Sequence, residues 1–209
     1  MVILAQDPSF NALAFSLYDG ENTVYIDNSS YALGESIGFN KVFVASMDLW
    51  EQYKKRLEHF NVGKSVNIDV IFSEIPPPVA NFAAGLFALD TFILYQLFSS
   101  YSTIKNVYTI PPSYLSTVHE TSKYKKSDST KLAKYFIQDV LSDYIKVVVP
   151  DNVSSSGRRT KGQINNDRAE SFLFLLRTFS KYDIMGLRNK INSEMKGFGV
   201  EVESLLIKR

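Results

Sequence analysis

Four acidic residues have the types and the spacing to support metal-dependent chemistry. Asp7 and Glu74 each follow an apolar run and are closely followed by proline. Asp167 and Glu170 are three positions apart at the start of a helical pattern, so they share one helix face. Clustered carboxylates repel one another, and divalent cations relieve that repulsion. Two ions roughly 4 Å apart can bind a phosphodiester, activate water and stabilise the leaving oxygen, so this set predicts a nuclease.

The remaining composition restricts which metal could bind. The chain has no cysteine and two histidines, which excludes a thiolate site and nearly excludes a histidine-built zinc centre. Oxygen ligands then remain, and they suit Mg²⁺, with Mn²⁺ as a substitute. The net charge of +1 neither requires nor excludes a polyanionic partner. No small-molecule cofactor is expected.

The elements expected to position the acids begin as strands in hairpin order and then alternate with helices, a pattern that predicts an α/β fold with a mixed sheet flanked by helices. The expected strands are residues 2–6, 12–18, 23–27, 65–73, 106–110 and 146–149, and the expected helices are 46–60, 79–101, 127–143 and 167–182, with a polar loop at 151–163. Residues 1–182 are read as one nuclease domain and 183–209 as a C-terminal extension, helical over 187–195 and extended over 198–207.

Neither a cleavable signal nor a membrane span is expected. Residues 78–98 are the most apolar stretch, but they contain Asn81, Asp90 and Gln96, which indicates a buried helix. A cytoplasmic protein without membrane contact is therefore the default expectation.

Each acid also has an ordinary structural explanation. Asp7 before Pro8 is typical of a turn, and Glu74 could be a solvated strand end. Asp167 and Glu170 fit a capping box, Asp-x-x-Glu, at a helix N-terminus. The combination favours a site, because the ends of neighbouring strands meet at one rim of a sheet and a helix crossing that rim would add the other two acids.

Three segments, in order, resemble the motifs of RuvC-like Holliday junction resolvases, a group of the ribonuclease H-like superfamily. They are Ile3-Leu4-Ala5-Gln6-Asp7-Pro8-Ser9, Val70-Ile71-Phe72-Ser73-Glu74-Ile75-Pro76 and Asn166-Asp167-Arg168-Ala169-Glu170-Ser171-Phe172. The resemblance covers residues 1–182 and implies a ribonuclease H-like fold, Mg²⁺-dependent cleavage of branched DNA and a homodimer. The last acid, Glu170, is usually aspartate in that family, and residues 151–163 are longer and more basic. The compact, divergent pattern suggests a phage-type or mobile-element member.

Basic and aromatic residues near these motifs are the candidate nucleic-acid contacts. Lysines lie where the family has phosphate-contacting lysines, a basic cluster precedes the last helix, and one aromatic side chain follows the Asp7 turn. The candidates are Lys123, Lys125, Lys126, Lys131, Arg158, Arg159, Lys161 and Phe10. For the charged ones a solvated surface is the alternative, and for Phe10 it is core packing. His119 could assist proton transfer, although a surface hydrogen bond explains it more simply.

Other functions compete with junction resolution. A flap nuclease or an RNA–DNA hybrid nuclease would use the same acids. An actin-like ATP-binding protein could share the first motif, but no Gly-x-Gly run occurs between residues 60 and 190. A non-catalytic DNA-binding or scaffold protein is the remaining class, and the intact acids argue against it.

Overall fold

The computed structural model describes residues 1–8, 12–30, 39–74, 80–110, 126–153 and 159–197. Its strands are β1 (Ile3–Pro8), β2 (Ala12–Tyr18), β3 (Thr23–Ser30), β4 (Val70–Glu74), β5 (Asn106–Ile110), β6 (Lys146–Val148), β7 (Asn152–Val153) and β8 (Arg159–Thr160). Its helices are α1 (Phe39–His59), α2 (Ala80–Ser100), α4 (Lys126–Tyr135), η2 (Phe136–Val140), α5 (Asn166–Tyr182), η3 (Ile184–Gly186) and α6 (Arg188–Gly197).

Six strands form one mixed sheet in the order β5-β4-β1-β2-β3-β6. β1 and β2 pair antiparallel, as do β2 and β3, so the chain opens with the hairpin order expected from the sequence. β4 and β5 then continue the sheet parallel to β1, and β6 pairs parallel with β3. The predicted α/β class, with a mixed sheet flanked by helices, is confirmed.

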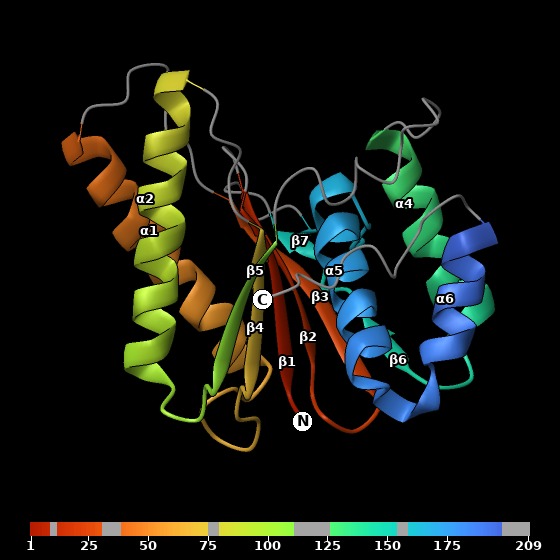
Figure 1. The fold of residues 1–209 in the computed structure, drawn as a ribbon. Helices are drawn as coiled ribbons and strands as arrows, with labels where there is room; N and C mark the ends of the chain where they lie inside the picture. Colours follow the sequence, from red (N-terminus) through yellow and green to blue (C-terminus); the bar gives the residue numbers. More distant parts are fainter. Residues whose placement is uncertain (9–11, 31–38, 75–79, 111–125, 154–158, 198–209) are drawn as a thin grey trace.

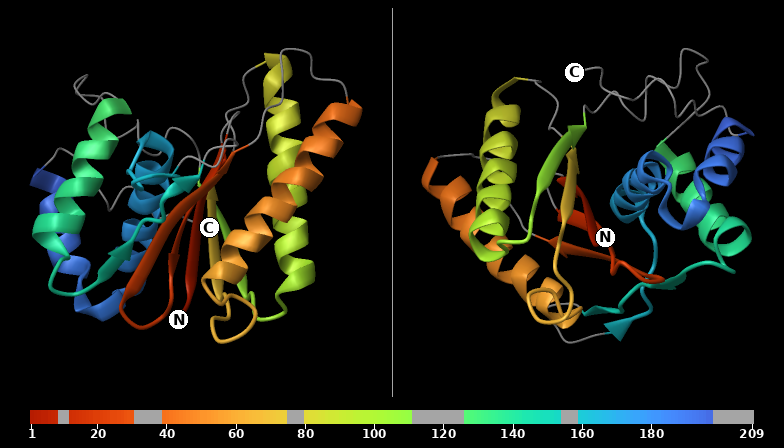
Figure 2. Two further views of the ribbon diagram at one scale, coloured as in Figure 1. Left: turned by 180° about the vertical axis from the view of Figure 1, so that it is seen from behind. Right: turned by 60° about the horizontal axis from the view of Figure 1, so that its bottom comes forward.

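The sheet separates two hydrophobic cores. Because side chains alternate along a strand, Ile3 and Ala5 of β1 enter one core, and Leu4 between them enters the other. Figures 1 and 2 show α1 and α2 covering one face and α4, α5 and α6 covering the other. The strand positions therefore decide on which face a polar side chain emerges.

The most apolar helix is only partly buried. α2 turns Leu86, Leu89, Ile93 and Leu97 to the sheet, as predicted for a buried helix. Its outer side carries exposed apolar side chains, Phe87, Tyr95 and Phe98. Within the described ranges no helix has both the length and the apolarity that a membrane span requires.

Two helices differ from the sequence prediction. α1 begins at Phe39 rather than at residue 46, and Val44, which lies just before the predicted start, is 59% exposed rather than part of a buried apolar stripe. The predicted helix at 127–143 divides into α4 and a π-helical turn, η2. In that turn the Leu141 amide donates to the Phe136 carbonyl at 2.8 Å, the five-residue spacing of a π-helix.

The segment 151–163 was predicted to be a loop, which is wrong in part. β7 and β8 pair antiparallel, with Asn152 opposite Thr160, and form a short hairpin. Gly162 closes its base, because a Cβ there would lie 2.4 Å from the Pro150 carbonyl oxygen and 2.6 Å from that of Val149. The Gly162 amide also donates to the Asp151 carboxylate at 3.1 Å. We refer to residues 151–153 and 159–162 as the basic hairpin.

The first part of the predicted C-terminal extension packs on the main domain. α6 contributes Ile191 and Met195, and Leu187 before it joins them, to the core beneath α4 and α5. Up to Gly197 the extension thus shares a core with the rest of the chain. The extended segment predicted at 198–207 lies outside the described residues.

Candidate active site

Asp7 and Glu74 lie side by side at the ends of two parallel strands. The register of β1 and β4 pairs Gln6 with Ser73, which places Asp7 and Glu74 at the next position of each strand. Both side chains emerge on the α5 face, since Ala5 and Phe72, two residues earlier, belong to the core on that face. Asp7 is 3% exposed, and its carboxyl group is hydrogen-bonded to that of Glu74.

α5 brings the other two acids to this strand end. Burial raises the pKa of Asp7 well above its usual value, the hydrogen bond with Glu74 raises it further, and the charges of Glu74, Glu170 and Asp167 add to the shift. All four predicted acids therefore lie within electrostatic reach of one another. A hydrogen-bonded carboxyl pair beside two further carboxylates has the oxygen ligands that a hard cation prefers.

The described side chains do not form a closed metal cage. Among the residues that the structure describes, no three Asp, Glu, His or Cys side chains converge closely enough to hold an ion. The residue types and the shared strand end nevertheless fit Mg²⁺, which prefers carboxylate oxygens. The assignment of the four acids as metal ligands stays a prediction.

The capping explanation for Asp167 and Glu170 is wrong. The N-cap of α5 is Asn165, whose side-chain oxygen accepts a hydrogen bond from the Arg168 amide at 3.0 Å. Asp167 is the second residue of the helix and Glu170 lies a turn in, so neither occupies a capping-box position.

α4 packs against α5 beside these acids. The hydroxyl of Ser129 donates to Glu170 Oε1 over a long 3.5 Å contact, and Thr130 Oγ1 donates to the Asn166 side chain at 2.8 Å. Lys131, the next residue of α4, is exposed. A predicted phosphate-contacting lysine thus lies on the helix that flanks Glu170.

The remaining predicted nucleic-acid contacts are described by the structure to different extents. Lys161 is exposed at the end of the basic hairpin, and Arg159 belongs to β8. Lys126 is the first residue of α4, and only its backbone position is described. The other candidates lie outside the described residues: Phe10, His119, Lys123, Lys125 and Arg158. Their roles stay predictions.

A buried polar cluster supports Asp7 and Glu74 from the opposite face of the sheet. The amide nitrogen of Gln6 donates to Ser73 Oγ at 2.9 Å and to Asp90 Oδ1 at 3.0 Å. Ser73 Oγ donates to the same Asp90 oxygen at 2.9 Å, and Tyr53 donates to Gln6 Oε1 at 3.2 Å. Gln6 and Ser73 directly precede the two acids, so the cluster fixes the register in which they meet.

Sequence reasoning missed this cluster, although its signal was present. A polar residue stands before each acid in an otherwise apolar strand, and Asp90 interrupts the most apolar helix. Burial and the nearby charge of Glu74 raise the pKa of Asp90 to about 6, while the hydrogen bonds from Ser73 and Gln6 oppose that shift.

We expect Asp90→Asn to change how stability depends on pH. Because the folded-state pKa of Asp90 is raised from 3.8 to about 6, the folded protein holds this proton more tightly, and wild-type stability falls as pH rises through that window. Asparagine keeps the acceptor oxygen without the charge. Relative to wild type, the variant should gain up to about 3 kcal/mol in unfolding free energy between pH 3.5 and pH 7.

Chemical denaturation across that pH range, in EDTA, measures the difference. Asp48→Asn, at an exposed position on α1, is the matched control and should show no such gain. A constant difference between Asp90→Asn and wild type across the range would contradict the prediction.

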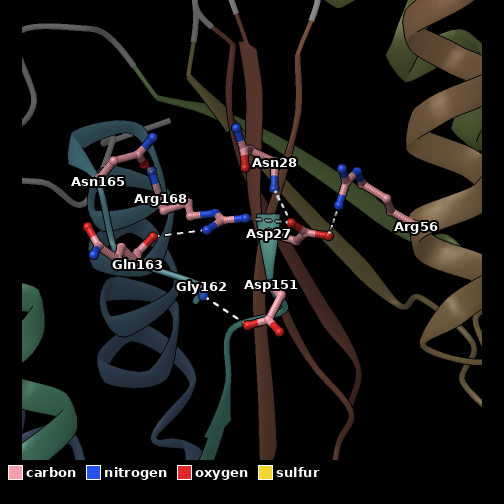
Figure 3. A network of polar contacts seen from close by, with 8 residues as sticks. All are labelled: Asp27, Asn28, Arg56, Asp151, Gly162, Gln163, Asn165 and Arg168. Atoms are coloured by element: carbon pink, nitrogen blue, oxygen red, sulfur yellow. Dashed lines mark hydrogen bonds and ion pairs between the residues drawn. The ribbon is translucent and has the colours of Figure 1, made fainter. Parts of the chain in front are cut away.

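A second buried network, drawn in Figure 3, joins α5 to β3 and α1. Asp27 of β3 accepts from Arg168 Nη2 at 2.8 Å through Oδ1 and from Arg56 Nη1 through Oδ2. Asp27 and Arg168 are each 1% exposed, which is rare for charged side chains unless they are paired. Arg168 stands between the two acids of α5, so this network adjoins the candidate site.

Comparisons with known proteins give weak and distant similarities. No protein-family model matches the chain, and no curated protein matches it. Among solved structures, the yeast mitochondrial Holliday junction resolvase Ydc2 is 15% identical with a TM-score of 0.45, over 82% of this chain and 75% of that chain. Thermus thermophilus RuvC in complex with a Holliday junction substrate is 11% identical with a TM-score of 0.41, over 69% of this chain and 87% of that chain.

A ROK hexokinase from Thermus thermophilus is also similar, with 14% identity and a TM-score of 0.33, over 67% of this chain and 39% of that chain. All three TM-scores lie below 0.5. Similarity at this level is shared by resolvases and a kinase, so it does not distinguish between their activities.

Proposed function

We propose that this chain is a metal-dependent endonuclease of the ribonuclease H-like type that cuts Holliday junctions by phosphodiester hydrolysis. The observation that carries the proposal is the hydrogen-bonded pair Asp7 and Glu74 at the ends of parallel strands, with Asp167 and Glu170 near enough to raise the pKa of Asp7. Four carboxylates held against mutual repulsion destabilise a protein unless they serve a ligand.

In this proposal the four acids hold Mg²⁺, with Mn²⁺ as a substitute. The bound ions would supply an activated water and neutralise charge on the phosphate. The chain's own part is to fix the ligands: the β1–β4 register holds Asp7 beside Glu74, and α5 presents Asp167 and Glu170 to them. Lys131 and Lys161, both exposed, would contact backbone phosphates of branched DNA in this proposal.

A homodimer is part of the same proposal, because two cuts in opposed strands require two active sites. The exposed apolar side chains of α2, Phe87, Tyr95 and Phe98, offer a surface that a second copy could cover. The molar mass in solution tests this directly, since the monomer mass is 23.7 kDa.

The experiment that tests the activity compares substrates of equal length: a four-way junction, a flap, an RNA–DNA hybrid and plain duplex. Each is incubated with Mg²⁺, with Mn²⁺ and with EDTA. We expect paired nicks in the junction with either metal and none in EDTA. Glu74→Gln, which removes one charge from the strand-end pair, should abolish cleavage while junction binding persists.

Other outcomes lead to defined alternatives. Cleavage of the flap or the RNA–DNA hybrid in preference to the junction would support the metal-dependent nuclease activity but would show that the junction is not the preferred substrate. Binding without cleavage of any substrate in either metal would reject the nuclease and favour a DNA-binding protein. Full activity of Glu74→Gln would reject the acid pair as the catalytic centre.

A further inference from the structure

Arg168 makes contacts that reach well beyond its own helix. Its side chain, 1% exposed, donates from Nη2 to Asp27 Oδ1 at 2.8 Å across 141 residues of sequence. The other oxygen of Asp27 is taken by Arg56 of α1. Figure 3 shows the two arginines approaching Asp27 from opposite sides, one from α5 and one from α1. Asp27 therefore links helices from both layers to the sheet.

The strand pairing explains why Arg168 can reach Asp27. β6 pairs with β3 at Thr23, Val24 and Tyr25, and the pairing ends before Asp27. Tyr25, two residues before Asp27, packs with the α1 side of the sheet, so Asp27 belongs to that face. Arg168 reaches it from the α5 side, beyond the end of β6.

The same guanidinium also holds the end of the basic hairpin. Arg168 Nη1 donates to the Gln163 carbonyl at 2.9 Å, directly after Gly162. Gly162 is itself tied to Asp151 at 3.1 Å, and its tight approach to Pro150 leaves no space for a side chain. The hairpin base and the first turn of α5 are thus attached to one buried group.

That attachment lies beside the clustered acids. Asp167 and Glu170 lie on either side of Arg168 in the α5 sequence, and their charges repel that of Asp7 at the strand end. The first turn of a helix is also the part that frays most easily. A buried ion pair within this turn opposes both effects, because separating it would leave charges in a low-dielectric interior.

We propose that Arg168 and Asp27 are a positioning pair: they hold the first turn of α5 so that Asp167 and Glu170 face Asp7 and Glu74, and they keep the basic hairpin in fixed relation to those acids. The inference rests on the proposed nuclease function for its kinetic consequence. Its structural consequence, a first turn of α5 ordered by Asp27, is independent of any activity.

Arg168→Lys tests the pair with the charge retained. Lysine cannot reproduce the fork that bonds Asp27 and Gln163 together. We expect kcat for junction cleavage to fall about 10–100-fold and the Mg²⁺ concentration for half-maximal activity to rise, as for losses of groups that orient metal ligands. The junction Kd, measured in Ca²⁺, should rise by no more than about threefold, because only the hairpin contact of Lys161 is loosened and Lys131 lies on α4, which Arg168 does not hold. If Arg168 only stabilised the fold, its replacement would not lower kcat while leaving the junction Kd nearly unchanged.

A second readout needs no activity. Hydrogen exchange of the amides at 167–171, in metal-free protein, should be faster in Arg168→Lys than in wild type. Arg56→Gln is the matched control, because it removes the other arginine of Asp27 and leaves α5 attached. Exchange at 167–171, kcat and the Mg²⁺ midpoint should all stay near wild type in that variant.

The outcomes separate this inference from the proposed function. Wild-type protein that cleaves nothing would reject the function, while hydrogen exchange would still decide the positioning role. Unchanged kcat, Mg²⁺ midpoint and exchange in Arg168→Lys would overturn the inference, as would equal losses in Arg56→Gln. If Arg168→Lys does not fold, the neutral pair Asp27→Asn with Arg168→Gln replaces it. Wild-type kcat and exchange in that folded double variant would likewise overturn the inference.

Discussion

Asp7→Asn is expected to abolish cleavage and, in the absence of metal, to make the protein more stable. Loss of this carboxylate removes one member of the strand-end pair, and we expect kcat to fall by roughly 10³-fold or more, which corresponds to about 4 kcal/mol in activation free energy. The stability gain follows from the raised pKa of Asp7, which reflects burial and the neighbouring acids Glu74, Glu170 and Asp167. Asparagine carries no charge that those acids could repel.

Thermal denaturation at pH 8 measures the second effect. In EDTA the melting temperature of Asp7→Asn should exceed that of wild type, because a group with a raised folded-state pKa weakens the fold once pH exceeds that pKa. Adding Mg²⁺ should stabilise wild type more than the variant, since binding to the folded state is stabilising. A variant that is less stable than wild type in EDTA would instead indicate that Asp7 serves as a structural turn residue.

Asp27→Ala is expected to cause the largest loss of stability, about 3–5 kcal/mol in unfolding free energy. The carboxylate is 1% exposed and accepts from Arg168, Arg56 and the Asn28 amide, so its removal leaves a buried guanidinium without its counter-charge. Denaturant unfolding at neutral pH gives the difference directly.

Arg56→Gln again provides the control for this prediction. The Arg56 side chain is 38% exposed, so water can replace its contact with Asp27, and the expected cost is within about 1 kcal/mol. Similar losses in the two variants would mean that the contact with α1, rather than the buried contact with α5, carries the stability of this network.

The strands and the strand-end acids could be predicted because they depend on local pattern. Alternating or continuous apolar runs closed by turn residues gave β2 and β5 with the observed bounds, and they placed Glu74 at the end of β4. The proximity of Asp7 to Glu74 follows once β1 and β4 are neighbours, which the resemblance to a known family implied.

The supporting networks could not be predicted in the same way. Gln6 and Asp90 are 84 residues apart, and Asp27 and Arg168 are 141 apart, so their pairing exists only in the folded chain. The cap of α5 was misassigned for a related reason. Asn165 and Asp167 are both good capping residues, and only the backbone geometry at Asn165 selects the first.

The residues that pair in these networks are far apart in the sequence, and this separation affects how fast the protein folds. β1 pairs with β2 next to it in sequence, but it also pairs with β4 and lies under α5, and contacts so far apart slow folding more than they affect stability. During synthesis Asp7 leaves the ribosome long before Asp167 and Glu170. The nascent chain therefore carries an incomplete set of acids until α5 has emerged, and it can acquire the proposed activity only after that helix docks.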